Sequence, residues 1–277
     1  MKMSFTNVPI TVINQLYSKS NKLDAFADTN ALLEICDRNL QPFVHFWTTE
    51  EATLILGIND RHLPKLPDGL RSLISNHYDY FLRNSGGLAV VSDPGILNIS
   101  LFIPQPDTAY SIDQAYEIIK GLISMSFPQL DIQSYEVTNS YCPGKYDLSV
   151  NGQKIAGIAQ RRTTNALVLM LYLSVNGDQD GRSETVAEFY NEADAYSQSR
   201  WTFPKVDKTS MTTVQQLGFS DITRSDVEHK FLESINQQNI DVDVTSGSDL
   251  LISQEFTAER QKQLRKIQLR NAQLPIV

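Results

Sequence analysis

Residues 146–159, YDLSVNGQKIAGIA, carry the strongest short-range structural signal in the chain. Two runs that alternate apolar and polar residues, 146–150 and 153–159, flank the pair Asn151-Gly152. Both residues of a two-residue turn between such runs need positive φ angles, which asparagine and glycine adopt most readily. The pair therefore predicts a β-hairpin.

Further strands are expected on both sides of this hairpin. Residues 166–175 form a strongly apolar run of strand length, and shorter runs rich in β-forming residues precede the hairpin. These shorter runs are 43–47, 53–56, 78–82, 88–91 and 96–103. The chain up to Gly177 is therefore expected to contribute most of a β-sheet.

Helical patterns flank and follow these strands. Residues 26–38 predict a helix with Asp28 or Thr29 as possible caps, and Ser111 is placed as the N-cap of a second helix whose apolar stripe extends to Ile123. After Gly177 the chain becomes more polar, and helices are expected near 183–197, 212–217, 225–236 and 257–270. A mixed central sheet with flanking helices is an α+β fold.

Length and composition describe one ordinary globular chain. With 277 residues, 41% of them hydrophobic and 20% charged, the sequence can form either a single domain or a domain with a small appendage. We interpret it as one domain over residues 1–277, with a more helical part at about 178–277. No repeat or linker marks a boundary between them.

Targeting signals and a disulfide framework are not expected. The N-terminus lacks the apolar region of a signal peptide, and no uninterrupted apolar run is long enough to span a bilayer. Two cysteines, Cys36 and Cys142, are too few for a disulfide framework and lack the spacing of a zinc site. We therefore expect a cytoplasmic protein with reduced thiols and no membrane partner.

The charge of the chain is acidic, with a basic segment near its end. A net charge of −8 argues against nucleic acid as the main partner. From Ala258 onward the charges are Arg260, Lys262, Arg265, Lys266 and Arg270 against Glu259, a local net charge of +4 that leaves −12 on the rest. This helix is either a solvated cap on the domain or a docking surface for an acidic partner.

Two adjacent glycines, Gly86 and Gly87, lie between the polar turn that begins at Arg83 and the expected strand at 88–91. A glycine pair at such a position lets the backbone approach a ligand closely, or it simply forms a turn or bulge. The segment is neither a P-loop nor a dinucleotide fingerprint, because it lacks their further glycines and the Lys-Ser/Thr pair.

Cys142 is the candidate nucleophile, although the residues alone also allow an ordinary loop cysteine. It precedes Pro143-Gly144, and the proline is expected to hold Cys142 in extended backbone, outside a helix, where it is accessible. Cys36 falls on the apolar stripe of the first helix and is expected in the core.

Lys154 lies in the apolar second arm of the hairpin, a poor place for a merely solvated charge. An ammonium beside a thiol favours the thiolate anion, so Lys154 could activate Cys142. Pairing across the turn puts Lys154 opposite Ser149, roughly 20 Å of extended chain from Cys142. The loop at Pro143 must therefore fold back over the sheet.

The histidines and carboxylates do not suggest a metal centre or a histidine-based triad. His45, His62, His77 and His229 show no metal-ligand spacing, and each is interpreted as structural or surface. No carboxylate cluster accompanies them, so we expect no metal.

Together these segments resemble the biotin/lipoate protein ligase superfamily. Residues 83–90 and 93–100 resemble its glycine-rich lipoyl-binding segment, and residues 154–160 resemble its lysine signature. Residues 140–144 and 146–152 resemble the octanoyltransferase subgroup of amidotransferase type that acts in lipoate assembly. The likeness is strong from about Arg83 to Arg162 and diffuse elsewhere.

The resemblance implies a catalytic domain with the superfamily's mixed sheet, and it implies site roles. Cys142 would be the acyl-thioester nucleophile, and Lys154 would favour its thiolate. Arg83, Gly86, Gly87 and Asn98 would line the acyl pocket. The segment 84–88 lacks the third glycine and second arginine of typical ligases, and Lys145 adds a charge beside the loop of the nucleophile.

The implied reaction is a two-step acyl transfer without ATP, metal or other cofactor, because the octanoyl or lipoyl group is the substrate and arrives attached. The donor would be the glycine cleavage H protein. The acceptors would be lipoyl domains of 2-oxoacid dehydrogenase subunits. The alternatives are an ATP-dependent lipoate–protein ligase, which would not need Cys142, and a non-catalytic lipoyl-domain-binding protein.

Overall fold

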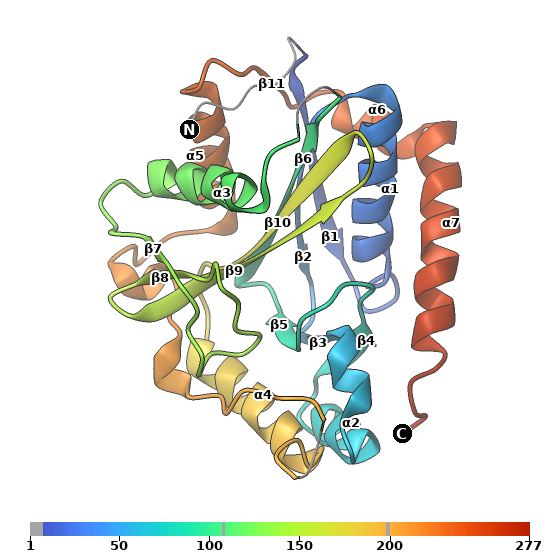
Figure 1. The fold of residues 1–277 in the computed structure, drawn as a ribbon, viewed down its shortest axis with the longest axis vertical. Coiled ribbons are helices and arrows are strands. Elements are labelled where there is room, and N and C mark those ends of the chain that lie inside the picture. The colour runs from blue at the N-terminus through green and yellow to red at the C-terminus, as the bar shows by residue number, and fades with distance from the viewer. Residues whose placement is uncertain (1–7, 107–108, 198–199) are drawn as a thin grey trace.

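The fold is built on one large mixed sheet, and the computed structural model describes it through residues 8–106, 109–197 and 200–277 (Figure 1). Its eight strands lie in the order β11-β1-β2-β6-β10-β9-β8-β7. They are β1 (Ile10–Tyr17), β2 (Phe43–Thr49), β6 (Ile96–Pro104), β7 (Gln133–Ser134), β8 (Leu148–Val150), β9 (Gln153–Arg162), β10 (Ala166–Ser174) and β11 (Val242–Asp243). Strand β1 runs parallel to β2 and β11, whereas the remaining neighbours are antiparallel. The expected α+β fold with a mixed sheet is confirmed.

Helices cover both faces of the large sheet (Figure 1). Alternate residues of β6 and β10 point to opposite faces, as strand geometry requires. One face packs against α3 (Ile112–Ser126) and α5 (Arg224–Asn236), and the other against α1 (Asp24–Asn39). The candidate site lies on the α1 face.

A second, three-stranded sheet adjoins one end of the large one. Its order is β4-β3-β5, with β3 at Thr53–Leu56, β4 at Asp79–Leu82 and β5 at Val90–Ser92. Helices α2 (Leu66–Ser75) and α4 (Gln179–Glu192) pack with it around a core of their own. This small sheet carries the loop 83–89, called the glycine loop because it contains Gly86 and Gly87.

The predicted hairpin is confirmed in its turn and in its register. Asn151 and Gly152 both have positive φ, 51° and 86°. Ser149 pairs with Lys154 as expected, and a bulge then shifts the pairing so that Leu148 lies opposite Ala156.

Helix boundaries differ from the expectation in several places. Asp28 and Thr29 are not caps: α1 begins at Asp24, and Asp28 is buried within the helix, where it accepts from the Tyr17 hydroxyl at 2.8 Å. The helix expected at 212–217 is only a short 3-10 turn, Gln215–Leu217. Strand β1 and helix α2 were not expected. Further short 3-10 turns span Ile58–His62 and Lys208–Ser210.

The C-terminal part of the chain returns to the large sheet. Strand β11 pairs with β1, and α6 (Gly247–Ile252) and α7 (Gln254–Asn271) follow it. Helix α7 lies beside α1 (Figure 1), where Arg260 Nε donates to Asp28 Oδ1 at 2.8 Å. Among the described residues, no helix is long and apolar enough to cross a membrane.

Candidate active site

A cavity of about 540 Å³ opens on the α1 face of the large sheet. Its floor includes Trp47, Asn98, Tyr172 and Gly157, which are register partners in one row across β2, β6, β10 and β9. Apolar side chains such as Phe26 contribute to the wall. Its size and largely apolar lining suit a small organic ligand.

All six residues predicted for the site line this one cavity. They come from three separate segments: the loop after β4, strand β6, and the loop and hairpin around Cys142. They are Arg83, Gly86, Gly87, Asn98, Cys142 and Lys154. The structure therefore brings together residues that lie up to 71 positions apart in the sequence.

Cys142 lies in a folded-back loop, as the distance to Lys154 required, but its backbone is not extended. Its φ is 46°, a left-handed conformation that a non-glycine residue adopts at some cost in free energy. The expected extended backbone is therefore wrong, because contacts made by the loop outweigh the local preference, whereas the expected position outside a helix is confirmed. Cys142 is half-buried, whereas Cys36 is fully buried in α1, as predicted.

The sulfur of Cys142 faces the glycine loop. Leu88 N donates to Cys142 Sγ at 3.3 Å, and Arg83 Nη2 lies 3.6 Å from the same sulfur. A cation and a backbone N–H are both groups that stabilise a thiolate.

The ammonium of Lys154 is buried and contacts the backbone of the Cys142 loop. It donates to the carbonyl oxygens of Tyr141 and Cys142 at 3.0 and 2.9 Å, and to Ser140 Oγ at 3.2 Å. It also forms an ion pair with Asp147 Oδ1 at 3.0 Å. Within the described part of the chain, these oxygens are its hydrogen-bonding partners, and the sulfur of Cys142 is not among them.

Asp147 connects the loop to the hairpin. Its side chain is 2% exposed, and its Oδ2 accepts from Gly144 N at 3.0 Å and from Val137 N at 3.3 Å. Burial raises the pKa of Asp147, while the Lys154 ammonium and the two backbone donors act in the opposite direction. One carboxylate thus holds both ends of the loop and the lysine beneath it.

The glycine loop is held from behind by a buried acid and a buried phenol. Asp60 Oδ2 accepts from Gly57 N at 2.7 Å, and its Oδ1 accepts from the Tyr190 hydroxyl at 2.9 Å. That hydroxyl in turn accepts from Ala89 N at 3.1 Å. Burial raises the pKa of Asp60 to about 7. A Cβ on Gly57 would lie 2.0 Å from Gly87 O, so only glycine lets the loop pack here.

Two predicted residues occupy less constrained positions. Among the described residues, no atom lies within 4 Å of a Cβ built on Gly86, so no close approach within this part of the chain requires glycine there. Asn98 Nδ2 donates to Trp47 O at 3.4 Å, which places an amide among the apolar side chains of the floor.

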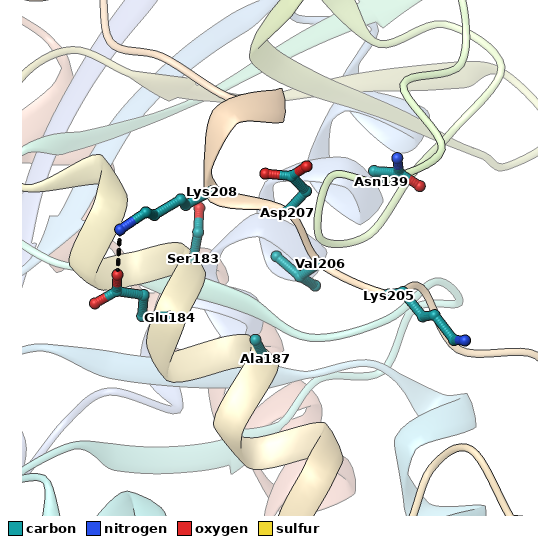
Figure 2. A pocket seen from close by; sticks show the side chains of 8 residues that line it. All are labelled: Asn139, Ser183, Glu184, Ala187, Lys205, Val206, Asp207 and Lys208. Carbon is teal, nitrogen blue, oxygen red and sulfur yellow. Dashed lines mark hydrogen bonds and ion pairs between the residues drawn. The ribbon is translucent and has the colours of Figure 1, made fainter.

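A second hollow, of about 600 Å³, lies between α4 and the segment 205–208 (Figure 2). Figure 2 shows Lys208 directed at Glu184, and the two form an ion pair at 2.8 Å. None of the six predicted site residues lines it, and it offers no cysteine or buried lysine. The predicted site residues therefore belong to the first cavity.

Among the described residues, no three His, Cys, Asp or Glu side chains lie close enough together to bind a metal ion. His45 is fully buried, and burial lowers its pKa to about 3, so it is neutral. His62 stacks on Trp201, with ring centroids 4.6 Å apart. Lys145 lies over the Tyr146 ring at 5.0 Å.

The sequence prediction missed Asp147, Asp60 and Tyr190. Asp147 could have been found, because a lysine buried in an apolar hairpin needs a carboxylate partner and Asp147 is the nearest along the chain. Asp60 and Tyr190 are 130 residues apart and carry no local signal of their contact.

Comparison with protein families matches residues 21–236 to the lipoyl protein ligase A/B catalytic domain. An octanoyl-[GcvH]:protein N-octanoyltransferase of Oceanobacillus iheyensis is 37% identical over 218 residues, 78% of this chain and 77% of the relative. A lipoyl-[GcvH]:protein N-lipoyltransferase of Listeria monocytogenes is 36% identical over 215 residues, 77% of this chain and 76% of the relative.

The fold is also similar to a solved structure. A lipoate-protein ligase A bound with ATP superimposes with a TM-score of 0.71 at 17% identity, over 94% of this chain and 95% of the other. At this identity the likeness concerns the fold alone.

Proposed function

We propose that this chain, which belongs to the lipoyl protein ligase A/B catalytic-domain family, transfers an octanoyl or lipoyl group between protein lysines through a thioester on Cys142. Its relatives are named as transferases of these two groups, and the chain is an acyltransferase of the same kind. The donor in this proposal is the glycine cleavage H protein, and the acceptors are lipoyl domains of 2-oxoacid dehydrogenase subunits.

One observation carries the proposal: the sulfur of Cys142 lies in the cavity, within 3.6 Å of a guanidinium and 3.3 Å of a backbone N–H. A thiol at an ordinary site is only a few per cent thiolate at neutral pH. Donors fixed beside the sulfur favour the anion, which is the nucleophile that acyl transfer needs.

In the first half-reaction the thiolate attacks the carbonyl carbon of the acyl-lysine amide on the donor. A carbon–sulfur bond forms, the carbon–nitrogen bond breaks, and the donor lysine leaves as an amine that takes up a proton. In the second half-reaction the amine of the acceptor lysine attacks the thioester. A carbon–nitrogen bond forms, the carbon–sulfur bond breaks, and the amine loses a proton as the thiolate returns.

The other predicted residues have supporting roles in this proposal. Lys154 holds the loop of the nucleophile through the carbonyl oxygens of Tyr141 and Cys142. Gly86, Gly87 and Asn98 line the space for the acyl group. The reaction uses no cofactor, because each step exchanges one acyl bond for another. It takes place in the cytoplasm, where a free thiol stays reduced.

Intact-mass analysis tests the proposal. The protein is mixed with octanoylated H protein in the absence of ATP, and we expect one added octanoyl group that is lost when a lipoyl domain is then supplied. Cys142→Ala should abolish the adduct, and the matched variant Cys36→Ala should keep it. An adduct that persists in Cys142→Ala, or that requires ATP, would refute the thioester route.

A further inference from the structure

We infer that Arg83, rather than Lys154, is the catalytic residue that stabilises the thiolate of Cys142. The inference rests on the proposed function, because it assigns a role at the same nucleophile. Arg83 Nη2 lies 3.6 Å from Cys142 Sγ, whereas the partner of the Lys154 ammonium in that residue is the carbonyl oxygen, at 2.9 Å. The two cations therefore act on different atoms of the cysteine.

The guanidinium is fixed in place before any substrate binds. Arg83 Nη2 donates to the carbonyl oxygens of Gly86 and Leu88, both at 3.0 Å, so the loop wraps around its own arginine. The N–H of Leu88 then points to the sulfur from the same loop, at 3.3 Å. Donors held in this way stabilise a charge without reorganising when it develops.

Gly87 makes this contact possible. Its φ is +83°, and a Cβ built there would lie 2.8 Å from Arg83 Nη2 and 3.1 Å from Cys142 Sγ. Any side chain at this position would push the guanidinium and the sulfur apart. The glycine pair thus allows Arg83 and Cys142 to lie in contact, in addition to leaving space for a ligand.

The charges around the two cations also favour Arg83 as the residue that stabilises the thiolate. The Lys154 ammonium is paired with the Asp147 carboxylate at 3.0 Å, which offsets its field at the sulfur. Arg83 forms no ion pair among the residues that the structure describes. Its buried Nε has no hydrogen-bond partner there either.

Other titratable groups near the sulfur are common to all variants of the test. Tyr190 and Asp60 lie behind the glycine loop, and Asp147 and Lys154 lie on the side of the hairpin. Tyr190 stays neutral, since burial raises its pKa well above the usual value. The Arg83 guanidinium lowers the pKa of Asp60, and the Lys154 ammonium lowers that of Asp147, so each replacement raises the pKa of one neighbouring carboxyl. Because each replacement affects one carboxyl in this way, the change in Cys142 reactivity on replacing Arg83 is compared with that on replacing Lys154.

The test measures the rate of Cys142 alkylation by iodoacetamide at neutral pH, divided by the rate at a pH where every thiol is ionised. This ratio reports the thiolate fraction and corrects for changes in loop accessibility. We expect Arg83→Gln to lower it about tenfold, the effect of removing one close opposite charge. Arg83→Lys should largely restore it, and Lys154→Met should leave it within about twofold. Lys145→Gln, which removes an exposed charge three positions from Cys142, is the matched control.

A ratio that falls in Lys154→Met and stays unchanged in Arg83→Gln would overturn the inference and return the role to the lysine. Because alkylation needs no acyl donor, this outcome is separate from a failure of the proposed function. If no octanoyl adduct formed, the proposed transfer reaction would be wrong, but the assignment of Arg83 as the stabilising cation would stand. Thermal melting of each variant verifies that the compared proteins are folded.

Discussion

Lys154 Nζ lies 2.9 Å from the carbonyl oxygen of Cys142, so the lysine holds the main chain of the cysteine in place. The sulfur of the same residue is turned toward Arg83 Nη2, 3.6 Å away. One buried cation thus contacts the backbone of the loop, and a second cation lies beside its thiol. The predictions that follow test these separate tasks and the structure that supports them.

Asp147→Asn should lower the free energy of unfolding by about 3–5 kcal/mol, because it leaves the buried Lys154 ammonium without its counter-charge. The loop should also loosen, since a neutral amide at this position cannot accept from Gly144 N as strongly as the carboxylate does. Denaturant unfolding measures the first effect, and the rate of acyl transfer measures the second.

The double variant Asp147→Asn with Lys154→Met is the control for this pair. Removing both charges should cost less than the sum of the two single changes, because neither partner is left buried alone. Costs that simply add would mean that the two residues do not stabilise the loop as a pair.

Cys142→Gly should be about 0.5–1 kcal/mol more stable than Cys142→Ala, because glycine adopts a φ of 46° without steric cost. The same comparison at Cys36, inside α1, should have the opposite sign, since glycine is a poor helix former. Chemical denaturation of the four variants tests both signs. If alanine were the more stable residue at position 142, the loop would not have the left-handed backbone described.

Asp60 should make the stability of the protein depend on pH between about 4 and 7. Burial raises its pKa from 3.8 to about 7 in the folded state, so the folded protein keeps a proton that the unfolded chain releases in this range. The stability from this group is complete at low pH and is lost as pH rises through 7, with a slope of up to about 1.4 kcal/mol per pH unit.

Asp60→Asn removes that titration and keeps an acceptor for Gly57 N. As the pH rises from 5 to 7.5, the parent should therefore lose stability relative to the variant. Denaturant unfolding of both proteins at each pH measures this change. Parallel curves for the two proteins would show that Asp60 titrates normally.

The basic helix α7 offers a test of partner docking. Arg260 is already paired with Asp24 and Asp28 of α1, whereas Arg265 and Lys266 are exposed. If these charges steer acidic lipoyl domains, reversing both to Glu should lower the second-order rate of transfer and flatten its dependence on salt. Rates equal to the parent's at low salt would mean that the helix only caps the domain. Alkylation of Cys142 should not change in either case.

Local signals explain which parts of the fold could be predicted from the sequence. Asn151-Gly152 and the Ser111 cap act within four residues, and both behave as expected. Strand β1 escapes prediction because its polar residues, such as Asn14 and Gln15, hide the strand pattern; Gln15 pairs with Asp28 in α1. Asp28 itself has the local pattern of a cap, whereas its actual partners are distant in sequence.

The residues of the candidate site could be predicted from the sequence, but the contacts between them could not. Cys142 and Lys154 could be singled out, because a proline-flanked cysteine and a lysine in an apolar strand are both unusual. Which atom of Cys142 lies near Arg83 and which near Lys154 depends on how loops from different sheets pack. No spacing in the sequence encodes that packing. For the same reason, the conformation of Cys142 departs from the preference that Pro143 imposes.

The contact of Tyr190 with Asp60 and with the N–H of Ala89 has a consequence for biosynthesis. Arg83, Cys142 and Lys154 all leave the ribosome before Tyr190, which belongs to α4. The glycine loop has its full support only after α4 has docked on the small sheet. A growing chain that has not yet reached residue 190 therefore holds its glycine loop without the support of Tyr190.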